Sequence, residues 1–281
     1  MRADSAWAGR LVAAALLLAG GTATHANERL PLADAHIHYS EVVWDVLSPR
    51  AAHHTLVRAG VRHAVIFGVP HEGALRLAAE EPARYTLFVQ PYRVPEDRHR
   101  AWYEDPRVLE HLRERVATGI YRGIGEFHLH SGQTDTPIVD GMLALAREHD
   151  LYLLAHSDTA VIEGFLDRFP DLKVIWAHAG AWTLPMTMDV VMGRYPQLYV
   201  ELSMRDGDIA PDGTLDPRWA EVLVRYADRF MVGIDTFSER RWTHYDELAE
   251  RTRGWLAQLP DEVAERIAWK NAHELFGGEK P

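Results

Sequence analysis

The chain has 281 residues, of which 47% are hydrophobic and 25% charged, the balance of a globular protein with a full apolar core. The 41 acidic residues outnumber the 30 basic ones and give a net charge of -11, and no run of Lys or Arg is long enough to follow a phosphate backbone. The sequence therefore argues against a nucleic-acid partner. It contains no cysteine, which excludes disulfides, thiolate metal ligands and a cysteine nucleophile.

The N-terminal segment has the pattern of a secretory signal peptide. Arg2 and Arg10 precede the apolar stretch LVAAALLLAGGTA, and a small-x-small cleavage signal ends at Ala26. The stretch is too short for a convincing membrane span, which needs roughly 20 residues. We therefore expect residues 1–26 to be removed. Residues 27–281 should form an exported domain, periplasmic or secreted, without a stable membrane anchor; an uncleaved anchor is the alternative.

Beyond this segment, apolar runs rich in β-branched and aromatic residues alternate with segments of helical periodicity. The apolar runs predict eight strands, at residues 31–37, 63–69, 85–91, 121–127, 151–156, 173–178, 198–203 and 229–235. Helices are expected between and after them, at residues 108–118, 138–149, 160–169, 219–227, 246–259 and 261–276. Strands that each lead into a helix are typical of an α/β protein with a (β/α)₈ (TIM) barrel. No linker or low-complexity tract interrupts the pattern, so we expect a single domain.

Local signals support this pattern. Asp105-Pro106, Thr136-Pro137 and Asp216-Pro217 each place a side-chain acceptor before a proline, which is typical of a helix start. The segments 91–107 and 203–219, after the third and seventh strands, are long loops. Because such loops surround the substrate in a barrel, we expect both to shape the pocket.

The first strand carries the strongest chemical signal. His36 and His38 are two residues apart, so they share one face of the strand, which in a barrel is the interior. Two imidazoles at this spacing can bind one metal ion. Asp34 lies two residues before His36 and should share the same face, one step deeper in the barrel. We expect it to accept a ring N–H from a histidine ligand and so to orient that ligand.

Further metal-binding residue types close other apolar runs. His156 follows LYLLA, His178 follows KVIWA, and Asp235 ends RFMVGID, which should lie beside the first strand when the barrel closes. Together with His36 and His38, these residues predict one metal site at the barrel mouth. Asp235 could touch both the metal and its bound water, take a proton from that water and pass it to the leaving group.

Glu126, in GIGEFH, is the remaining candidate ligand. A glutamate at a strand end could bridge a second metal or act as an acid or substrate contact, and we favour two ions over one. His128 shares its face one step nearer the mouth. Arg93 and Arg205 follow strands three and seven and could hold a carboxylate or phosphate, while Trp182 could wall an apolar pocket. With His128, these form our candidate substrate contacts.

These motifs resemble the amidohydrolase superfamily and, within it, the amidohydrolase-related (amidohydrolase 2) branch. The resemblance rests on DAHIH, GEFH, the AHSD and AHAG histidines, GIDT and the closing NAHELF, and it covers the mature chain. It implies a metal-dependent (β/α)₈ hydrolase, usually with zinc, that cleaves amide, ester or lactone bonds of small molecules. It also implies that Asp235 is the proton shuttle and that His178 is a ligand or acts beside the metal.

One residue departs from the commonest pattern of that superfamily. Many two-metal members have a carboxylated lysine at the bridging strand, whereas this chain has Glu126, as do TatD-like and phosphotriesterase-like members. Members of the amidohydrolase-related branch often hold a single metal, and some are decarboxylases. A decarboxylase on the same scaffold is therefore the alternative function, and a metal-binding module without catalysis is a third.

Overall fold

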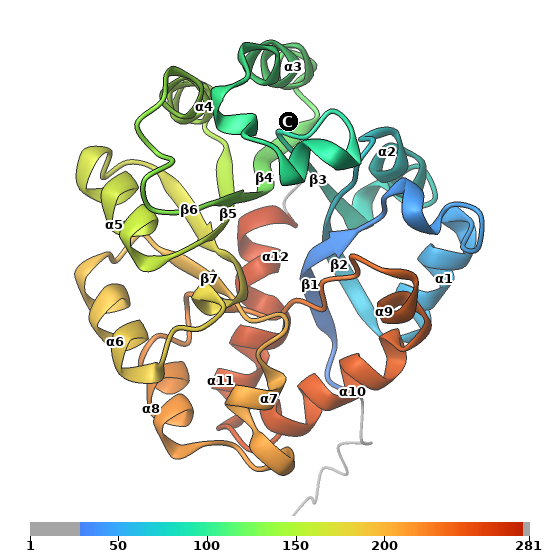
Figure 1. The fold of residues 1–281 in the computed structure, drawn as a ribbon. Coiled ribbons are helices and arrows are strands. Elements are labelled where there is room, and N and C mark those ends of the chain that lie inside the picture. Colours follow the sequence, from blue (N-terminus) through green and yellow to red (C-terminus); the bar gives the residue numbers. More distant parts are fainter. Residues whose placement is uncertain (1–28, 278–281) are drawn as a thin grey trace, which may run out of the picture.

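A computed structural model describes residues 29–277, and the expected signal peptide at residues 1–26 lies outside them. The fold is a barrel of eight parallel strands, each hydrogen-bonded to its neighbours in sequence order. The strands are β1 (Leu32–His38), β2 (Val61–Phe67), β3 (Tyr85–Val89), β4 (Tyr121–Leu129), β5 (Tyr152–Ser157), β6 (Lys173–Trp176), β7 (Tyr199–Glu201) and β8 (Phe230–Met231). Figure 1 shows the strands at the centre with helices around them, which confirms the predicted (β/α)₈ architecture.

Backbone contacts bring the last strand segment back to the first. The Ala35 N–H donates to the Val232 carbonyl at 2.9 Å, and the Asp235 N–H donates to the His36 carbonyl at 2.8 Å. The predicted closure, with Asp235 beside the first strand, is confirmed. The barrel therefore places residues 200 positions apart in the sequence around one axis.

The helices surround the strands, except for α12, which lies at one end of the barrel. They are α1 (Pro49–Arg58), α2 (Glu72–Ala78), α3 (Pro106–Val116), α4 (Pro137–Glu148), α5 (Thr159–Arg168), α6 (Pro185–Arg194), α7 (Asp206–Ile209), α8 (Pro217–Arg225), α9 (Glu239–Thr243), α10 (Tyr245–Leu256), α11 (Asp261–Glu265) and α12 (Asn271–Phe276). Their buried faces pack on the strands in one continuous apolar core. No helix in residues 29–277 is both long and apolar enough to cross a membrane.

The predicted helix starts are confirmed. The side chains of Asp105, Thr136 and Asp216 accept backbone N–H groups in the first turns of α3, α4 and α8. The helix expected at 261–276 is confirmed as one uninterrupted helical run, in which a π segment at Arg266–Lys270 connects α11 to α12.

Helix α12 covers the end of the barrel opposite the carboxyl ends of the strands. Figure 1 shows it behind the centre of the strand ring, and Phe276 packs edge-on against Phe88 and Tyr152 with ring centroids 5.7 and 5.0 Å away. These rings belong to a second apolar cluster made largely of inward-facing strand residues. Because the interior is filled from this end, polar side chains collect at the opposite, carboxyl end of the strands.

Strands six and eight end earlier than predicted. The chain leaves β6 at Trp176 and β8 at Met231, so His178 and Asp235 lie in turns beyond the strands. Both residues have left-handed backbone, with φ of 55° and 59°. A left-handed residue cannot continue a strand ladder, which is why the predicted strand ends at 178 and 235 were wrong.

Candidate metal centre

The two histidines of β1 point into the barrel, as their spacing predicted. Both are buried, and their Nε2 atoms lie 3.3 Å apart. The His36 Nδ1 atom lies 2.9 Å from Glu201 Oε2, at the end of β7. Because a carboxylate can only accept, Nδ1 carries a proton and Nε2 is left to face the centre of the barrel.

Asp34 does not orient a ligand ring, contrary to the sequence prediction. Its carboxylate accepts the backbone N–H groups of His36 and Ile234 at 3.0 Å and the Tyr245 hydroxyl at 2.6 Å. The side chain is directed toward Tyr245 of the outer helix α10 and joins β1 to the segment after β8. Burial raises its pKa to about 7 despite these hydrogen bonds.

Glu201 takes the role that we assigned to Asp34, and the sequence reasoning missed it. Its side chain is fully buried, and it also accepts the backbone N–H groups of Ser203 and His178. Gly233 makes room for it, since a Cβ there would lie 2.1 Å from Glu201 Oε1. The signal available in the sequence was a lone charged residue inside the apolar strand LYVEL.

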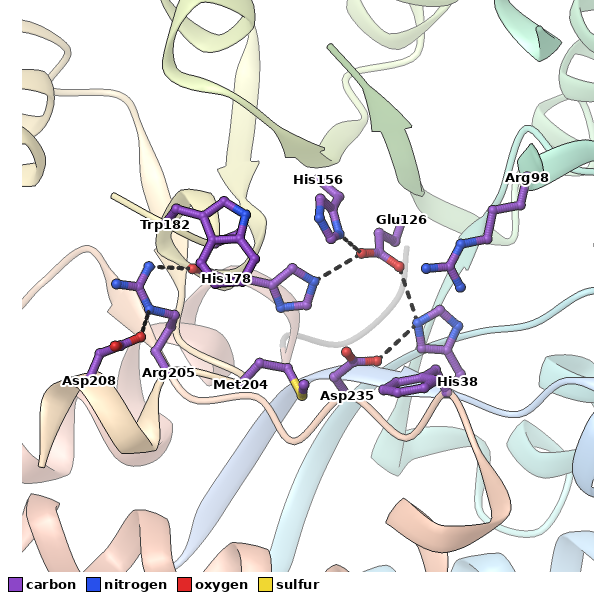
Figure 2. Close-up of a pocket in the computed structure, with 12 residues that line it drawn as sticks. His38, Arg98, Glu126, His156, His178, Trp182, Met204, Arg205, Asp208 and Asp235 are labelled. Carbon is purple, nitrogen blue, oxygen red and sulfur yellow. Dashed lines mark hydrogen bonds and ion pairs between the residues drawn. The ribbon is translucent and has the colours of Figure 1, made fainter. Parts of the chain in front are cut away.

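Glu126 lies at the centre of the cluster, and its two oxygens face different histidines (Figure 2). Oε2 lies 3.2 Å from His38 Nε2 and 3.6 Å from His36 Nε2. Oε1 lies 2.8 Å from His156 Nδ1 and 3.0 Å from His178 Nε2. One carboxylate thus connects the β1 histidines with those that follow β5 and β6.

Asp235 faces the β1 histidines from the other side. Its Oδ1 atom lies 3.3 Å from His38 Nε2 and 3.6 Å from His36 Nε2. This oxygen is buried and has no hydrogen-bond partner among residues 29–277. A buried carboxylate oxygen without a donor is costly, and a cation between it and the imidazole nitrogens would compensate it.

The electrostatics of the cluster also suit a cation. Burial disfavours a charged His36, but the carboxylates of Glu201, Asp235 and Glu126 outweigh burial and hold the His36 pKa well above its usual value. Burial likewise opposes ionisation of Glu126, yet the neighbouring imidazoles hold its pKa well below the usual range. The cluster therefore has an excess of negative charge that imidazole protons offset, and a divalent cation could replace those protons.

All six predicted ligands meet in this cluster. The donor atoms of three overlapping sets lie within 4.8 Å of one another: His36, Glu126 and His178; His36, His38 and Asp235; and Glu126, His128 and His156. Nitrogen and carboxylate oxygen donors at this density are typical of zinc and similar divalent metals. The residues present thus fit the metal that the sequence predicted.

Two cavities open above the cluster and share its floor. One, of about 310 Å³, extends toward Trp182, Met204 and Phe237. The other, of about 440 Å³, extends toward Val42, Tyr92 and His128. Both predicted long loops contribute lining residues, as expected.

The four candidate substrate contacts differ in position. Trp182 and His128 line the cavities, and Trp182 is 91% exposed. Arg205 also lines one cavity, but its guanidinium is occupied by the carbonyls of residues 178, 179 and 183 and by Asp208. Arg93 lines neither cavity, because Asp97 and Asp105 hold it within its own loop.

Arg98 is the cation from that loop which faces the site, and the sequence reasoning missed it. It lines both cavities, and Figure 2 shows its guanidinium directed toward Glu126 and His38. Nothing in the sequence separates Arg98 from Arg93 or Arg100, because the loop has no periodicity that would give the direction of a side chain.

Comparisons with known proteins agree with the geometry. A family model described as amidohydrolase matches residues 24–278. No curated protein matches the chain. Similar solved structures include a probable 2-pyrone-4,6-dicarboxylic acid hydrolase from Acinetobacter baumannii with citric acid bound, which is 13% identical, covers 88% of this chain and 100% of its own, and has a TM-score of 0.59.

Two further solved structures share the fold. An amidohydrolase from Burkholderia multivorans with bound zinc is 16% identical, covers 87% of this chain and 98% of its own, and has a TM-score of 0.58. A 2,6-dihydroxybenzoate decarboxylase complexed with 2,6-dihydroxybenzoate is 14% identical, covers 88% of this chain and 99% of its own, and has a TM-score of 0.54. At these identities the likeness shows the shared fold.

Proposed function

The chain belongs to the amidohydrolase family, and from that premise we propose that it is an exported enzyme that cleaves an amide, ester or lactone bond of a small molecule with a metal-activated water. Membership and the barrel make it an enzyme of the metal-dependent hydrolase type. The observation that carries the proposal is the buried Oδ1 of Asp235, which has no hydrogen-bond donor in the described part of the chain and faces the His36 and His38 nitrogens.

We propose that zinc is the metal and that the site takes two ions. His36, His38 and Asp235 would hold one ion, His156 and His178 the other, and the two oxygens of Glu126 would serve both. A bound zinc ion supplies Lewis acidity, which polarises the scissile carbonyl and lowers the pKa of water to about 7. The zinc-containing relative of the same fold supports this choice.

The protein side chains would then orient the histidine ligands and transfer the proton. Glu201 keeps the His36 ring in the tautomer whose Nε2 faces the centre, and the Ser203 hydroxyl and carbonyl, 2.8 and 3.3 Å from Nδ1, do the same for His178. Burial opposes ionisation of Asp235, but His36 and His38 outweigh it and lower its pKa to about 2. Asp235 is therefore a carboxylate at neutral pH, able to accept the proton of the attacking water and return it to the leaving group.

Decarboxylation on the same scaffold is the alternative, since a decarboxylase shares this fold. Among the candidate carboxylate contacts from the sequence, Arg205 would matter most for that reaction. In the structure its guanidinium is already bound by three carbonyls and Asp208, so Arg205 does not supply a free cation for either reaction. Product analysis separates the two reactions, because decarboxylation releases carbon dioxide without incorporating water.

The proposal is tested with zinc-loaded protein on a panel of lactones, esters and amides. Asp235→Asn preserves the shape of the side chain but removes its basicity, so kcat should fall by roughly 10²- to 10⁴-fold while the circular dichroism spectrum is unchanged. The matched control is Asp206→Asn, a half-buried carboxylate bonded to Trp255 and Thr252 outside the cavities, which should keep its activity. Full activity of Asp235→Asn on a substrate of the wild type would refute the proposal.

A further inference from the structure

The two cavities meet over the proposed metal ligands. His38, Glu126, Arg98 and Phe237 line both of them. A bond held above His38 and Glu126 would therefore have one substituent in each cavity. The character of each cavity indicates what its substituent should be.

The cavity toward Trp182 has mainly apolar surroundings. Trp182, Met204 and Phe237 are 91%, 48% and 43% exposed, and all three line this cavity. Besides the shared Arg98, this cavity is lined by Arg205, which is paired with Asp208 at 2.9 Å and holds loop carbonyls with its other nitrogens. An uncharged, apolar substituent suits this side.

Arg98 lines both cavities, but its contact with His128, which lines only the second cavity, places the guanidinium on that side. Arg98 Nη2 lies 3.0 Å from His128 Nε2, and among residues 29–277 no carboxylate lies within ion-pair distance of the guanidinium. Arg205, by contrast, has such a partner. Arg98 therefore faces the cavity with its charge uncompensated and most of its donors unused.

His128 and Tyr92 add a second donor beside Arg98. Because a guanidinium can only donate, His128 Nε2 accepts from Arg98 and the ring proton resides on Nδ1, 3.0 Å from the Tyr92 oxygen. The backbone N–H of His128 also donates to this oxygen, at 2.7 Å. With both of these groups donating to it, the Tyr92 hydroxyl hydrogen is directed away from His128, and Tyr92 lines the same cavity.

Two carboxylates also line this cavity and limit the charge of its occupant. Glu126 is committed to the histidine cluster, and Glu41 is exposed at the rim, where water screens it. Both favour a single negative charge over a doubly charged group such as phosphate.

From these contacts we propose that the substrate is a carboxylate-bearing molecule whose monoanionic group is bound by Arg98 and Tyr92 on one side of the scissile bond, with an apolar substituent against Trp182, Met204 and Phe237 on the other. This inference rests on the proposed function and adds the substrate class. Arg98 is the specificity-determining residue.

The test measures binding and does not require turnover. The probes are benzoate, phenylacetate and 3-phenylpropionate, each paired with its neutral amide of the same shape, and phenylphosphonate. They are titrated calorimetrically into wild-type protein and variants of equal measured zinc content. Arg98→Met should weaken binding of the preferred carboxylate by about tenfold or more and leave its amide unaffected, because a charge-assisted hydrogen bond is lost.

Three further variants sharpen the result. Arg98→Lys should restore part of the affinity, since it keeps the charge but not the planar fork. Tyr92→Phe should lower carboxylate affinity several-fold. The matched control is Arg100→Met, which removes the same charge from the same loop at a side chain that is 67% exposed and lines neither cavity, and it should change neither affinity.

Several outcomes would overturn the inference. They are wild-type binding in which no carboxylate exceeds its amide, carboxylate affinity unchanged in Arg98→Met, and phenylphosphonate binding more tightly than every carboxylate. Failure here remains distinct from failure of the proposed function. A hydrolase indifferent to Arg98 would refute only the substrate class, whereas Arg98-dependent carboxylate binding without hydrolysis would refute only the reaction.

Discussion

Glu201 shows how one buried side chain can direct a metal ligand without touching the metal. It accepts the Nδ1 proton of His36 at 2.9 Å and lies 3.9 Å from Nδ1 of His178. It therefore acts on both halves of the proposed site. We expect Glu201→Gln to lower zinc affinity by roughly 10- to 100-fold, because the amide is neutral and no longer fixes the ring tautomer.

This effect is measured by competition with a chromogenic zinc chelator. Asp206→Asn again provides a carboxylate-to-amide control, at a half-buried position, and its zinc affinity should equal that of the wild type. If Glu201 only filled space, the nearly isosteric glutamine would bind zinc normally, and the orienting role would be wrong.

The absence of a side chain at Gly233 leaves room for Glu201 beside His36. A Cβ there would lie 2.1 Å from Glu201 Oε1 and 2.9 Å from His36 Cβ. Gly233→Ala should therefore destabilise the fold by about 1–3 kcal/mol and weaken zinc binding. Gly164→Ala in α5 is the contrasting change, because nothing lies within 4 Å of its Cβ and helix propensity improves by about 0.5–1 kcal/mol. Urea denaturation measures both, and equal stability of the two variants would contradict the steric argument.

For single residues, the sequence predicted which side chains face the site better than it predicted their hydrogen-bond partners. Alternation in a strand was enough to place His36 and His38 on one inward face. It could not separate Asp34 from Glu201 as the acceptor of a ring proton, because Asp34 is bonded to Tyr245 of α10 and the acceptor lies 165 positions away from His36. Arg93 and Arg98 lie in one irregular loop, so the direction of each was set by its tertiary partners, Asp97 for the first and His128 for the second.

At the scale of elements, the turn after β6 is held by a side chain from the loop after β7. His178, Ala179 and Ala181 all have positive φ, a conformation that non-glycine residues rarely adopt. Arg205 compensates by donating to the carbonyls of His178, Ala179 and Thr183 at 2.8–3.1 Å. The prediction of residues 173–178 as one strand failed because the local sequence does not indicate these contacts with Arg205. We call them the Arg205 clamp.

Loss of the Arg205 clamp should mainly lower the stability of the fold, and any loss of binding should follow from that. Arg205→Met leaves three loop carbonyls without their donor, and we expect a loss of at least about 2 kcal/mol of stability together with weaker zinc binding through His178. Asp208→Asn removes only the ion pair with an aspartate that is 60% exposed and should cost less than about 1 kcal/mol. Unchanged stability of Arg205→Met in urea denaturation, with only its substrate affinity altered, would show instead that Arg205 binds substrate.

At the scale of the whole molecule, the fold was predictable because it repeats. Each apolar run followed by a helical segment indicated one βα unit, and the number of units gave the closed barrel. The order of the strands along the chain then gave the place of each strand in the barrel. Residues at the carboxyl ends of the strands were therefore expected at one rim. The cover formed by α12 was not predicted, since the hydrophobic pattern of residues 261–276 indicates a helix and does not reveal which end of the barrel it covers or the π segment inside it.

Export is a prediction that rests on the N-terminal sequence alone. Expression of the full-length chain in a bacterium with a periplasm should release a mature protein that begins at Asn27, because cleavage is expected after Ala26. Intact mass and N-terminal sequencing of the periplasmic fraction measure this. An uncleaved chain retained with the membrane fraction would support the anchor alternative.

The central claim is that side chains from distant strands together hold a divalent metal. Elemental analysis of the purified chain, saturated with zinc and freed of excess metal, tests this most directly when wild type is compared with the double variant His36→Ala/His38→Ala. We expect close to two zinc ions per wild-type chain, which would support Glu126 as the shared ligand, and at most one in the double variant. A wild-type chain that retains no metal, or a double variant that retains as much as the wild type, would contradict the account.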